Sequence, residues 1–370
     1  MKIEAISTTI VDVPTRRPLQ MSFTTVHKQS YVIVQVTAGG LVGIGEGGSV
    51  GGPTWGSESA ETIKVIIDNY LAPLLIGKDA SNLSEARALM DRAVTGNLSA
   101  KAAIDIALHD LKARALNLSI ADLIGGTMRK SIPIAWTLAS GDTARDIDSA
   151  LEMDRSTATQ PLQGEAGRAH AGSGSGAHPQ HREGRGRQSV RARRRQPGMD
   201  EQTASIWIPR LEEAGVELVE QPVPRANFGA LRRLTEQNGV AILADESLSS
   251  LSSAFELARD RAVDAFSLKL CNMGGIANTL KVAAIAEAAG ISSYGGTMLD
   301  STVGTAAALH VYATLPSLPY GCELIGPWVL SDRLTQQDLE IKDFEVHLPV
   351  GSGLGVDLDH DKVRHYTRAA

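Results

Sequence analysis

Four charged residues each end an apolar run rich in β-branched side chains: Glu220, Asp245, Lys269 and Glu323. Segments with helical periodicity lie between them, and a further apolar run ends at Gly295-Gly296. Each interval has about the length of one strand plus one crossover helix, which indicates a parallel sheet closed into a barrel. The carboxyl ends of all strands of such a barrel share one rim, where its catalytic residues lie. The sequence therefore predicts an active site at this rim.

Two of these four residues are carboxylates at successive strand ends. Carboxylates that converge from adjacent strands form an oxygen-ligand site for a hard divalent cation, Mn²⁺ or Mg²⁺, so we interpret Glu220 and Asp245 as metal ligands. A single carboxylate in such a position more often forms a salt bridge. Lys269 ends the next strand and is our candidate for proton transfer. The alternative is a structural ion pair between Lys269 and Asp245.

The first 130 residues show a different pattern and predict an α+β domain over 1–130. Apolar and polar residues alternate in three short runs, which predicts an antiparallel meander with a turn at Gly39-Gly40. Those runs are 2–13, 30–36 and 41–46. Helical periodicity follows, with Ser99 as the cap of the last of three segments: 60–71, 83–94 and 99–116.

The glycine-rich segment 47–56 reads GGSVGGPTWG. A phosphate-binding loop must join a strand directly to a helix at a fixed spacing, and here Pro53 and Trp55 interrupt it. We favour a mobile loop that closes over a neighbouring active site, because glycine gives hinge freedom and Trp55 would supply an apolar lid. A plain connection is the alternative.

Composition sets outer limits on the function. A chain of 370 residues with 43% hydrophobic content can bury a large core and suggests one barrel, over 131–330, plus a companion domain. A net charge of -6 gives no reason to expect a nucleic-acid partner. No apolar run approaches the roughly 20 residues that span a bilayer. Two cysteines and a start without a signal-peptide pattern, MKIEAIS, predict a cytoplasmic protein.

The carboxy-terminal segment 331–370 is expected to return to the first domain. Residues alternate over 338–346 and 353–358, and a glycine-rich turn separates the two runs. Pairing with the first 130 residues would hold that domain over the barrel rim. The segment would thus complete an α+β capping domain.

One quarter of the barrel does not fit this scheme. The first barrel strand is expected over 132–138, and the strand-end spacing leaves room for two further strands near 164 and 194, which would make eight. Yet residues 154–199 contain nine arginines, no lysine, no aromatic residue, and only three large apolar residues. As written, this stretch is a disordered basic insertion, such as an RNA-binding arm.

The genetic code offers a second interpretation of this stretch. Protein that is rich in arginine, glycine and alanine but lacks lysine is what a GC-rich gene gives when it is read out of frame. A shift of one base allows Lys or Arg at Gln163 and at Glu165. The same shift allows Asp at Arg194. The shifted residues fall where the spacing requires strand ends, so we favour a frame error over an authentic insertion.

Several motifs together resemble a known family. VELVEQP, ILADES, SLKLCNMGG, YGGTMLDSTVGT and CELIGP are similar to the muconate cycloisomerases of the enolase superfamily, and most of all to the chloromuconate cycloisomerases. The resemblance runs along the whole chain except 154–199. It implies a (β/α) barrel of the enolase-superfamily type under an α+β capping domain.

The resemblance also implies roles for individual positions. The family's K-x-K pair, whose second lysine is an acid/base, matches Gln163 and Glu165. Its opposite-face lysine matches Lys269, and its eighth-strand carboxylate matches Glu323. Its three metal ligands match Arg194, Glu220 and Asp245. Two functional positions, 165 and 194, are therefore wrong as written, and the same one-base shift repairs both.

The implied reaction is lactonisation of a cis,cis-muconate, in particular a chlorinated one, to a muconolactone or dienelactone in aromatic catabolism. Mn²⁺, or else Mg²⁺, would stabilise an enolate intermediate. The substrate is a small dicarboxylate, no nucleic acid or membrane is involved, and the family implies a homo-oligomer. Candidate pocket walls are Thr54, Trp55, Cys271 and Trp328.

Two other functions remain open on the sequence alone. A racemase or epimerase of acylated amino acids or dipeptides belongs to the same subgroup and needs lysines on both faces. A non-catalytic, arginine-armed binding protein follows if the residues are taken as written. Arg194 would then occupy the metal site as an ion pair with Glu220 and Asp245. An incomplete barrel argues against it, because missing strands leave unpaired edges.

Overall fold

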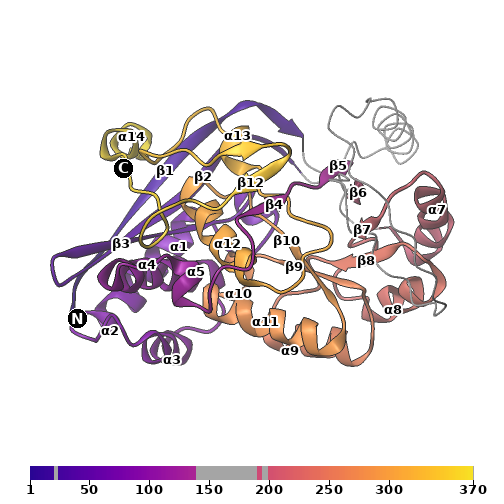
Figure 1. Ribbon diagram of the computed structural model, residues 1–370, viewed down its shortest axis with the longest axis horizontal. Coiled ribbons are helices and arrows are strands. Elements are labelled where there is room, and N and C mark those ends of the chain that lie inside the picture. The colour runs from indigo at the N-terminus through magenta and orange to yellow at the C-terminus, as the bar shows by residue number, and fades with distance from the viewer. Residues whose placement is uncertain (21–23, 139–189, 194–198, 370) are drawn as a thin grey trace, which may run out of the picture.

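The computed structural model describes residues 1–20, 24–138, 190–193 and 199–369. Its amino-terminal part is an antiparallel sheet of three strands in the order β1-β2-β3. The strands are β1 (Ile3–Gln20), β2 (Thr25–Ala38) and β3 (Leu41–Gly48), and Gly39 and Gly40 form the β2–β3 turn with positive φ angles. The predicted meander is confirmed, with longer strands than the alternation suggested. In Figure 1 these indigo strands lie beside the purple helices that cover them.

Those helices bury one face of the sheet. They are α1 (Ala60–Ile66), α2 (Ala72–Leu75), α3 (Leu83–Ala93), α4 (Leu98–Leu116) and α5 (Ile120–Leu123), with the π-helical turn η2 (Ile67–Leu71) between α1 and α2. Helix α4 packs so closely on β3 that a Cβ on Gly45 would lie 2.1 Å from the Ala103 carbonyl oxygen. The prediction of Ser99 as a cap is wrong. Asn97 caps α4 from a left-handed conformation, and Ser99 is buried in the first turn.

The second part of the chain contains a parallel sheet of six strands in the order β10-β9-β8-β7-β6-β5. They are β5 (Trp136–Leu138), β6 (Val190–Arg193), β7 (Leu218–Glu220), β8 (Ala241–Ala244), β9 (Ala265–Leu268) and β10 (Ser292–Gly295). Cys322 forms parallel bridges with Gly295 on one side and with Ile134 on the other. These two bridges close the sheet into a barrel.

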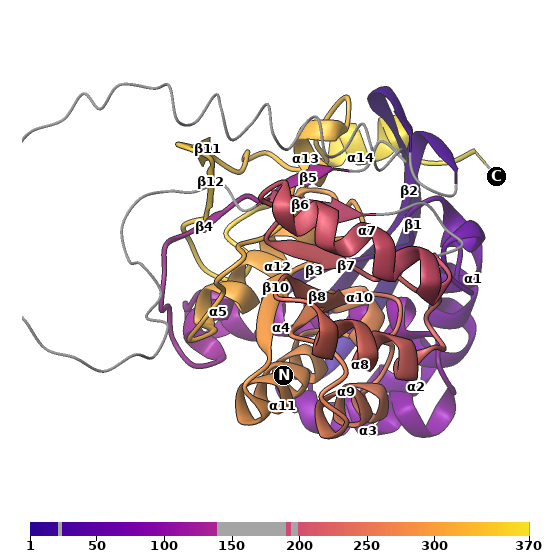
Figure 2. The ribbon, with the colours of Figure 1, turned by 90° about the vertical axis from the view of Figure 1, so that its right-hand side faces the viewer.

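Helices surround this barrel on the outside. They are α7 (Glu201–Glu213), α8 (Phe228–Gln237), α9 (Leu251–Arg259), α11 (Ile276–Ala289) and α12 (Thr302–Thr314), and the short helix α10 (Leu270–Met273) follows β9. Figure 2 shows α7, α8, α9 and α11 along one side of the strands. Within the part of the chain that is described, no helix is long and apolar enough to cross a bilayer.

The predicted number of barrel strands needs a correction. Strand β6 lies at the place expected for the strand near 194, but β5 and β6 are direct parallel neighbours, with Trp136 opposite Val190. No strand separates them, whereas one was expected near 164. The residues around 164 lie outside the described ranges. The physical reason is composition, because the written sequence there lacks the apolar side chains that a buried strand requires.

The carboxy-terminal segment returns partly as expected. Strands β11 (Ile341–Lys342) and β12 (Glu345–His347) pair with β4 (Ser131–Pro133) at the start of the barrel domain, not with the capping sheet. The last helix, α14 (His360–Tyr366), does reach the capping sheet, and Thr367 bridges Val11 of β1. The tail therefore joins the two domains.

Candidate active site

The barrel brings the four predicted rim residues to the ends of its strands. Glu220 is the last residue of β7, and Asp245 and Lys269 directly follow β8 and β9. Glu323 follows the bridging residue Cys322. All four side chains are buried, because apolar runs that pair as inner parallel strands end there.

Gln221 holds two of these strand ends together. Its side-chain oxygen accepts hydrogen bonds from the backbone N–H groups of Asp245 and Ser247, each at 3.0 Å. Its own backbone N–H donates to the Leu243 carbonyl at 2.8 Å. Gln221 adopts a φ of 39°, which a residue other than glycine adopts only when its surroundings hold it there. Glu220 and Asp245 are thus fixed on neighbouring strands.

Lys269 forms an ion pair with Asp245. Its ammonium nitrogen lies 2.5 Å from Asp245 Oδ1 and 5.3 Å from the centre of the Trp55 ring, within range of a cation–π contact. Gly296 leaves the space for this lysine, because a Cβ there would lie 2.8 Å from Lys269 Cγ. The ion pair weighed as an alternative is therefore present, and the capping-domain residue Trp55 covers it.

Glu323 is anchored on the opposite side of β10. Its backbone N–H donates to the Gly295 carbonyl at 2.8 Å, and the Thr297 N–H donates to its carboxylate at 3.4 Å. Glu323 is buried, like Lys269.

The described residues supply only part of the predicted metal site. Glu220 and Asp245 are two carboxylates at the ends of adjacent strands, but no group of three possible ligands occurs among residues with a described position. Arg194, the third ligand position, lies outside the described residues, as do Gln163 and Glu165. A guanidinium is not a metal ligand. The residues that the structure describes therefore do not by themselves complete a site for a divalent cation.

A cavity of about 150 Å³ lies between the capping domain and the barrel rim. Trp55 and Cys271 both line it, as predicted for pocket walls. Burial raises the pKa of the Cys271 thiol well above its usual range. The other two candidates do not line this cavity: Thr54 is exposed in the turn η1 (Gly52–Thr54), and Trp328, in α13 (Gly326–Val329), packs on the main core.

Several residues that line this cavity were not predicted from the sequence. Arg225, Met298 and Glu58 line it, and Arg225 is a cation that suits an anionic ligand. Arg225 lies five positions after Glu220, in the connection that leaves a catalytic strand end. That position is a signal that could have identified it.

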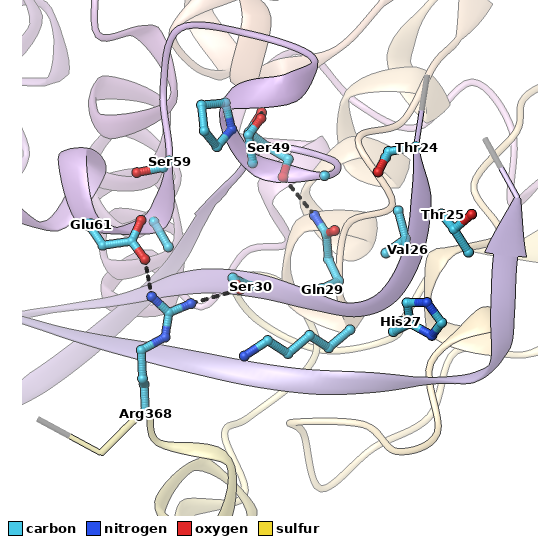
Figure 3. Close-up of a pocket in the computed structure, with 15 residues that line it drawn as sticks. Thr24, Thr25, Val26, His27, Gln29, Ser30, Ser49, Ser59, Glu61 and Arg368 are labelled. Carbon is cyan, nitrogen blue, oxygen red and sulfur yellow. Dashed lines mark hydrogen bonds and ion pairs between the residues drawn. The ribbon is translucent and has the colours of Figure 1, made fainter. Parts of the chain in front are cut away.

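A second, larger cavity of about 360 Å³ lies within the capping domain (Figure 3). Arg368 reaches it from the carboxy terminus, and its guanidinium donates to Asp12 at 2.6 Å and to Ser30 at 2.9 Å. It also pairs with Glu61. Gln29 and Ser49 line the inner side and are joined by a hydrogen bond of 3.2 Å. None of the rim residues with a described position lines this cavity.

A closed parallel barrel with buried carboxylates and a lysine at its strand ends, covered by an α+β domain, defines an enzyme of the enolase-superfamily architecture. Comparison with known proteins agrees with this class. Residues 5–125 match the N-terminal domain of the mandelate racemase / muconate lactonizing enzyme family, and residues 195–362 match the enolase C-terminal domain-like family.

Individual proteins of known identity are also similar to this chain. The chain is 90% identical over 371 residues to a chloromuconate cycloisomerase of Cupriavidus necator, with complete coverage of both chains. It is also similar to the crystal structure of a muconate lactonizing enzyme from Pseudomonas fluorescens in complex with muconolactone, with a TM-score of 0.85, 36% identity and 99% coverage of each chain. The 2-chloromuconate cycloisomerase of Rhodococcus opacus 1CP gives the same TM-score and identity, with complete coverage. The chain belongs to the mandelate racemase / muconate lactonizing enzyme family.

Proposed function

We propose that this protein is a cycloisomerase that converts a cis,cis-muconate, in particular a chlorinated one, to its lactone in the breakdown of aromatic compounds. The observation that carries the proposal is the full-length similarity to chloromuconate cycloisomerases, combined with Lys269 buried against the Asp245 carboxylate and covered by Trp55, which lines the cavity at the rim. A muconolactone-bound relative with the same fold supports the product class.

The chemistry follows from the residues around the cavity. One carboxylate of the substrate adds to the distant double bond, so that a carbon–oxygen bond forms and the displaced electron pair becomes an enolate on the other carboxyl group. Arg225 would pair with a substrate carboxylate, and Trp55 would exclude water above Lys269. The ammonium of Lys269 would stabilise the enolate, and Glu323 would hydrogen-bond near the reacting carboxylate. Loss of chloride and a proton from a chlorinated lactone would then give a dienelactone.

The proton for the α-carbon comes from a lysine at position 165 in this proposal. Glu165 stands there as written, and we propose that residues 154–199 are a frame-shifted reading of the natural protein. Two findings support this. Neither family match covers residues 126–194. One tenth of 371 aligned positions, about 37, differs from the Cupriavidus necator relative, and the stretch 154–199 is long enough to contain all of them.

The metal belongs to the same proposal. Members of the enolase superfamily use a divalent cation. We propose Mn²⁺, with Mg²⁺ as the alternative, held by Glu220, Asp245 and an aspartate that the corrected frame places at position 194. Such a cation would supply positive charge next to the developing enolate. The position of Glu220 and Asp245 at the ends of the neighbouring strands β7 and β8 supports this proposal.

Substrate turnover tests the function. The natural protein, incubated with cis,cis-muconate and its chlorinated derivatives in the presence of Mn²⁺, should remove the absorbance of the conjugated diene and give a lactone that is identified by NMR. Absence of any lactone would contradict the proposal. Exchange of the α-hydrogen of a dipeptide or an acylated amino acid with deuterium from solvent would instead support the racemase or epimerase.

Two wider expectations complete the proposal. Both cysteines are free thiols, which supports a cytoplasmic location. The homo-oligomer that the family implies stays a prediction. Analytical ultracentrifugation of the natural protein would test it, and a monomer at micromolar concentration would contradict it.

A further inference from the structure

The barrel loop 297–301, between β10 and α12, is held by side chains of the capping domain. The Gln29 side chain of β2 donates to the Met298 carbonyl at 3.4 Å, and the Tyr31 hydroxyl donates to the Leu299 carbonyl at 2.5 Å. Leu299 has a φ of 58°, a left-handed conformation that is unfavourable for a branched side chain. Contacts from another domain therefore add to the loop's own hydrogen bonds, in which the Asp300 carboxyl group accepts from the Thr297 hydroxyl at 2.9 Å and from the Met298 N–H at 3.1 Å.

Glu46 of β3 makes the third contact with loop 297–301. Its carboxyl group accepts a hydrogen bond from the backbone N–H of Ser301 at 2.8 Å and a second from the Ser301 hydroxyl. Ser301 is the residue that caps helix α12. A Cβ on Gly304 would lie 2.8 Å from Glu46 Oε1 and 2.8 Å from Asp300 Cβ, so the missing side chain leaves room for both acids.

Loop 297–301 supplies residues to the cavity at the rim. Met298 lines it together with Trp55 and Cys271, and the three belong to one apolar cluster shared by the two domains. Asp300 points to the same region, with its carboxyl oxygen 3.9 Å from Cys271 Sγ. Whatever fixes loop 297–301 thus fixes one wall of the cavity.

Glu46 and Asp300 are two buried acids that lie close together, so their protonation affects this contact. Burial, followed by the nearby Asp300 carboxyl, raises the pKa of Glu46 to about 8, and burial also raises the pKa of Asp300. The charged or titratable groups that face the two acids are Tyr31 from β2, Cys271 from α10 and Lys269 after β9. Two adjacent buried carboxyl groups cannot both ionise readily, so the pair retains a proton near neutral pH.

We propose that Glu46 is a positioning residue of the substrate cavity, which reaches across from the capping domain and holds loop 297–301, with Met298 and Asp300, in place. Glu46 does not touch the reacting atoms. The substrate assay used to test it rests on the proposed function, but the structural readout below does not.

The test compares Glu46→Ala with Glu46→Gln, which keeps the shape of the neutral side chain. In the natural protein at pH 7, labelling of Cys271 by N-ethylmaleimide, measured by peptide mass, should be at least tenfold faster in Glu46→Ala and within twofold of wild type in Glu46→Gln. Cys322, fully buried in the closing bridge, is the internal control and should stay unlabelled.

The matched control is His310→Ala. His310 is a buried polar residue of the same helix, α12, but its ring nitrogens contact Ala121 and Leu354, far from loop 297–301 in sequence. This variant should lose thermal stability without faster Cys271 labelling. If Glu46→Ala fails to fold, Ser301→Ala removes the hydroxyl contact with Glu46 together with the cap on the Val303 N–H, keeps the backbone N–H contact, and should still accelerate labelling several-fold.

Substrate kinetics provide the second readout. Glu46→Ala should raise KM about tenfold and leave kcat within threefold of wild type. Labelling and KM equal to those of His310→Ala would overturn the positioning role. Equal defects in Glu46→Gln and Glu46→Ala would overturn the neutral form. A wild-type protein without lactonisation would contradict the proposed function, while the labelling experiment would still decide the role of Glu46.

Discussion

Lys269 and Asp245 form an ion pair inside the barrel, whereas most ion pairs among the described residues lie at the surface. Both side chains are at most 1% exposed, and each is the charged partner of the other at 2.5 Å. The loss of one partner of such a pair leaves an uncompensated buried charge, which typically costs about 3–5 kcal/mol. Lys28 and Asp12 give a contrast, because that lysine side chain is 58% exposed.

The two pairs predict different effects of the same substitution. Lys269→Met should lower the free energy of unfolding by about 3–5 kcal/mol in metal-free buffer, and it should abolish lactonisation. Lys28→Met should cost at most about 1 kcal/mol. Urea unfolding followed by circular dichroism measures both. Equal losses would contradict the view that burial gives the pair at the rim its importance.

Glu46 predicts a dependence of stability on pH. Its pKa in the folded protein is about 8, against an ordinary value of 4.5 for glutamate, so between these pH values the folded state holds a proton that the unfolded state has released. The contribution of this group is therefore fully present below about pH 4.5 and is lost as pH rises toward 8. Glu46→Gln removes this loss. The Tm of Glu46→Gln minus that of wild type should rise from pH 5 to pH 8 and then level off. A Tm difference that stays constant over this range would contradict the raised pKa of Glu46.

At the scale of single strands and helices, local sequence patterns predicted some element boundaries correctly and others wrongly. The ends of β7, β8 and β9 were predicted from the sequence to within one residue, because buried apolar runs stop where a charged side chain must reach the rim. The cap of α4 was not predicted correctly, because Asn97 begins the helix from a left-handed conformation without a side-chain hydrogen bond. The Glu46–Ser301 contact was also missed, since it joins residues 255 positions apart and no local pattern marks it.

The start of α12 predicts an unusual response to a helix-favouring substitution. Gly304→Ala inside a helix should stabilise by about 1 kcal/mol on propensity alone. At this position the new Cβ would lie 2.8 Å from Glu46 Oε1, and such overpacking typically costs about 1–3 kcal/mol. We expect a net loss of stability and faster labelling of Cys271. Gly304→Ala with a higher Tm than wild type would show that the carboxyl group has room to move.

At the scale of the whole molecule, the sequence predicted both the capping domain and the barrel. It did not predict the arrangement of the barrel between β5 and β6. Motifs along the described residues were sufficient to identify the family and to locate four residues at the barrel rim. The third ligand and the acid/base could not be assigned from the residues as written, because Arg194 and Glu165 carry the wrong chemistry for those roles. Strand β5 pairs directly with β6, and the residues between them lie outside the described ranges.

The frame correction predicts a gain in metal binding. A chain with the shifted reading of 154–199 should bind about one equivalent of Mn²⁺ in equilibrium dialysis and show a higher Tm with Mn²⁺ than with EDTA, because a ligand of the folded state stabilises it. The chain as written, with two carboxylate ligands, should show neither effect. The same shifted chain with alanine in place of the aspartate at 194 is the control and should bind at least tenfold more weakly.

The masses of tryptic peptides from residues 150–205 of the natural protein test the central claim most directly. Our account predicts lysine-terminated peptides of ordinary length, with lysine at 165 and aspartate at 194. The arginines as written would instead give many very short fragments without an aromatic residue. Detection of those fragments would contradict the frame error, remove the acid/base and the third ligand from the site, and favour the arginine-armed binding protein.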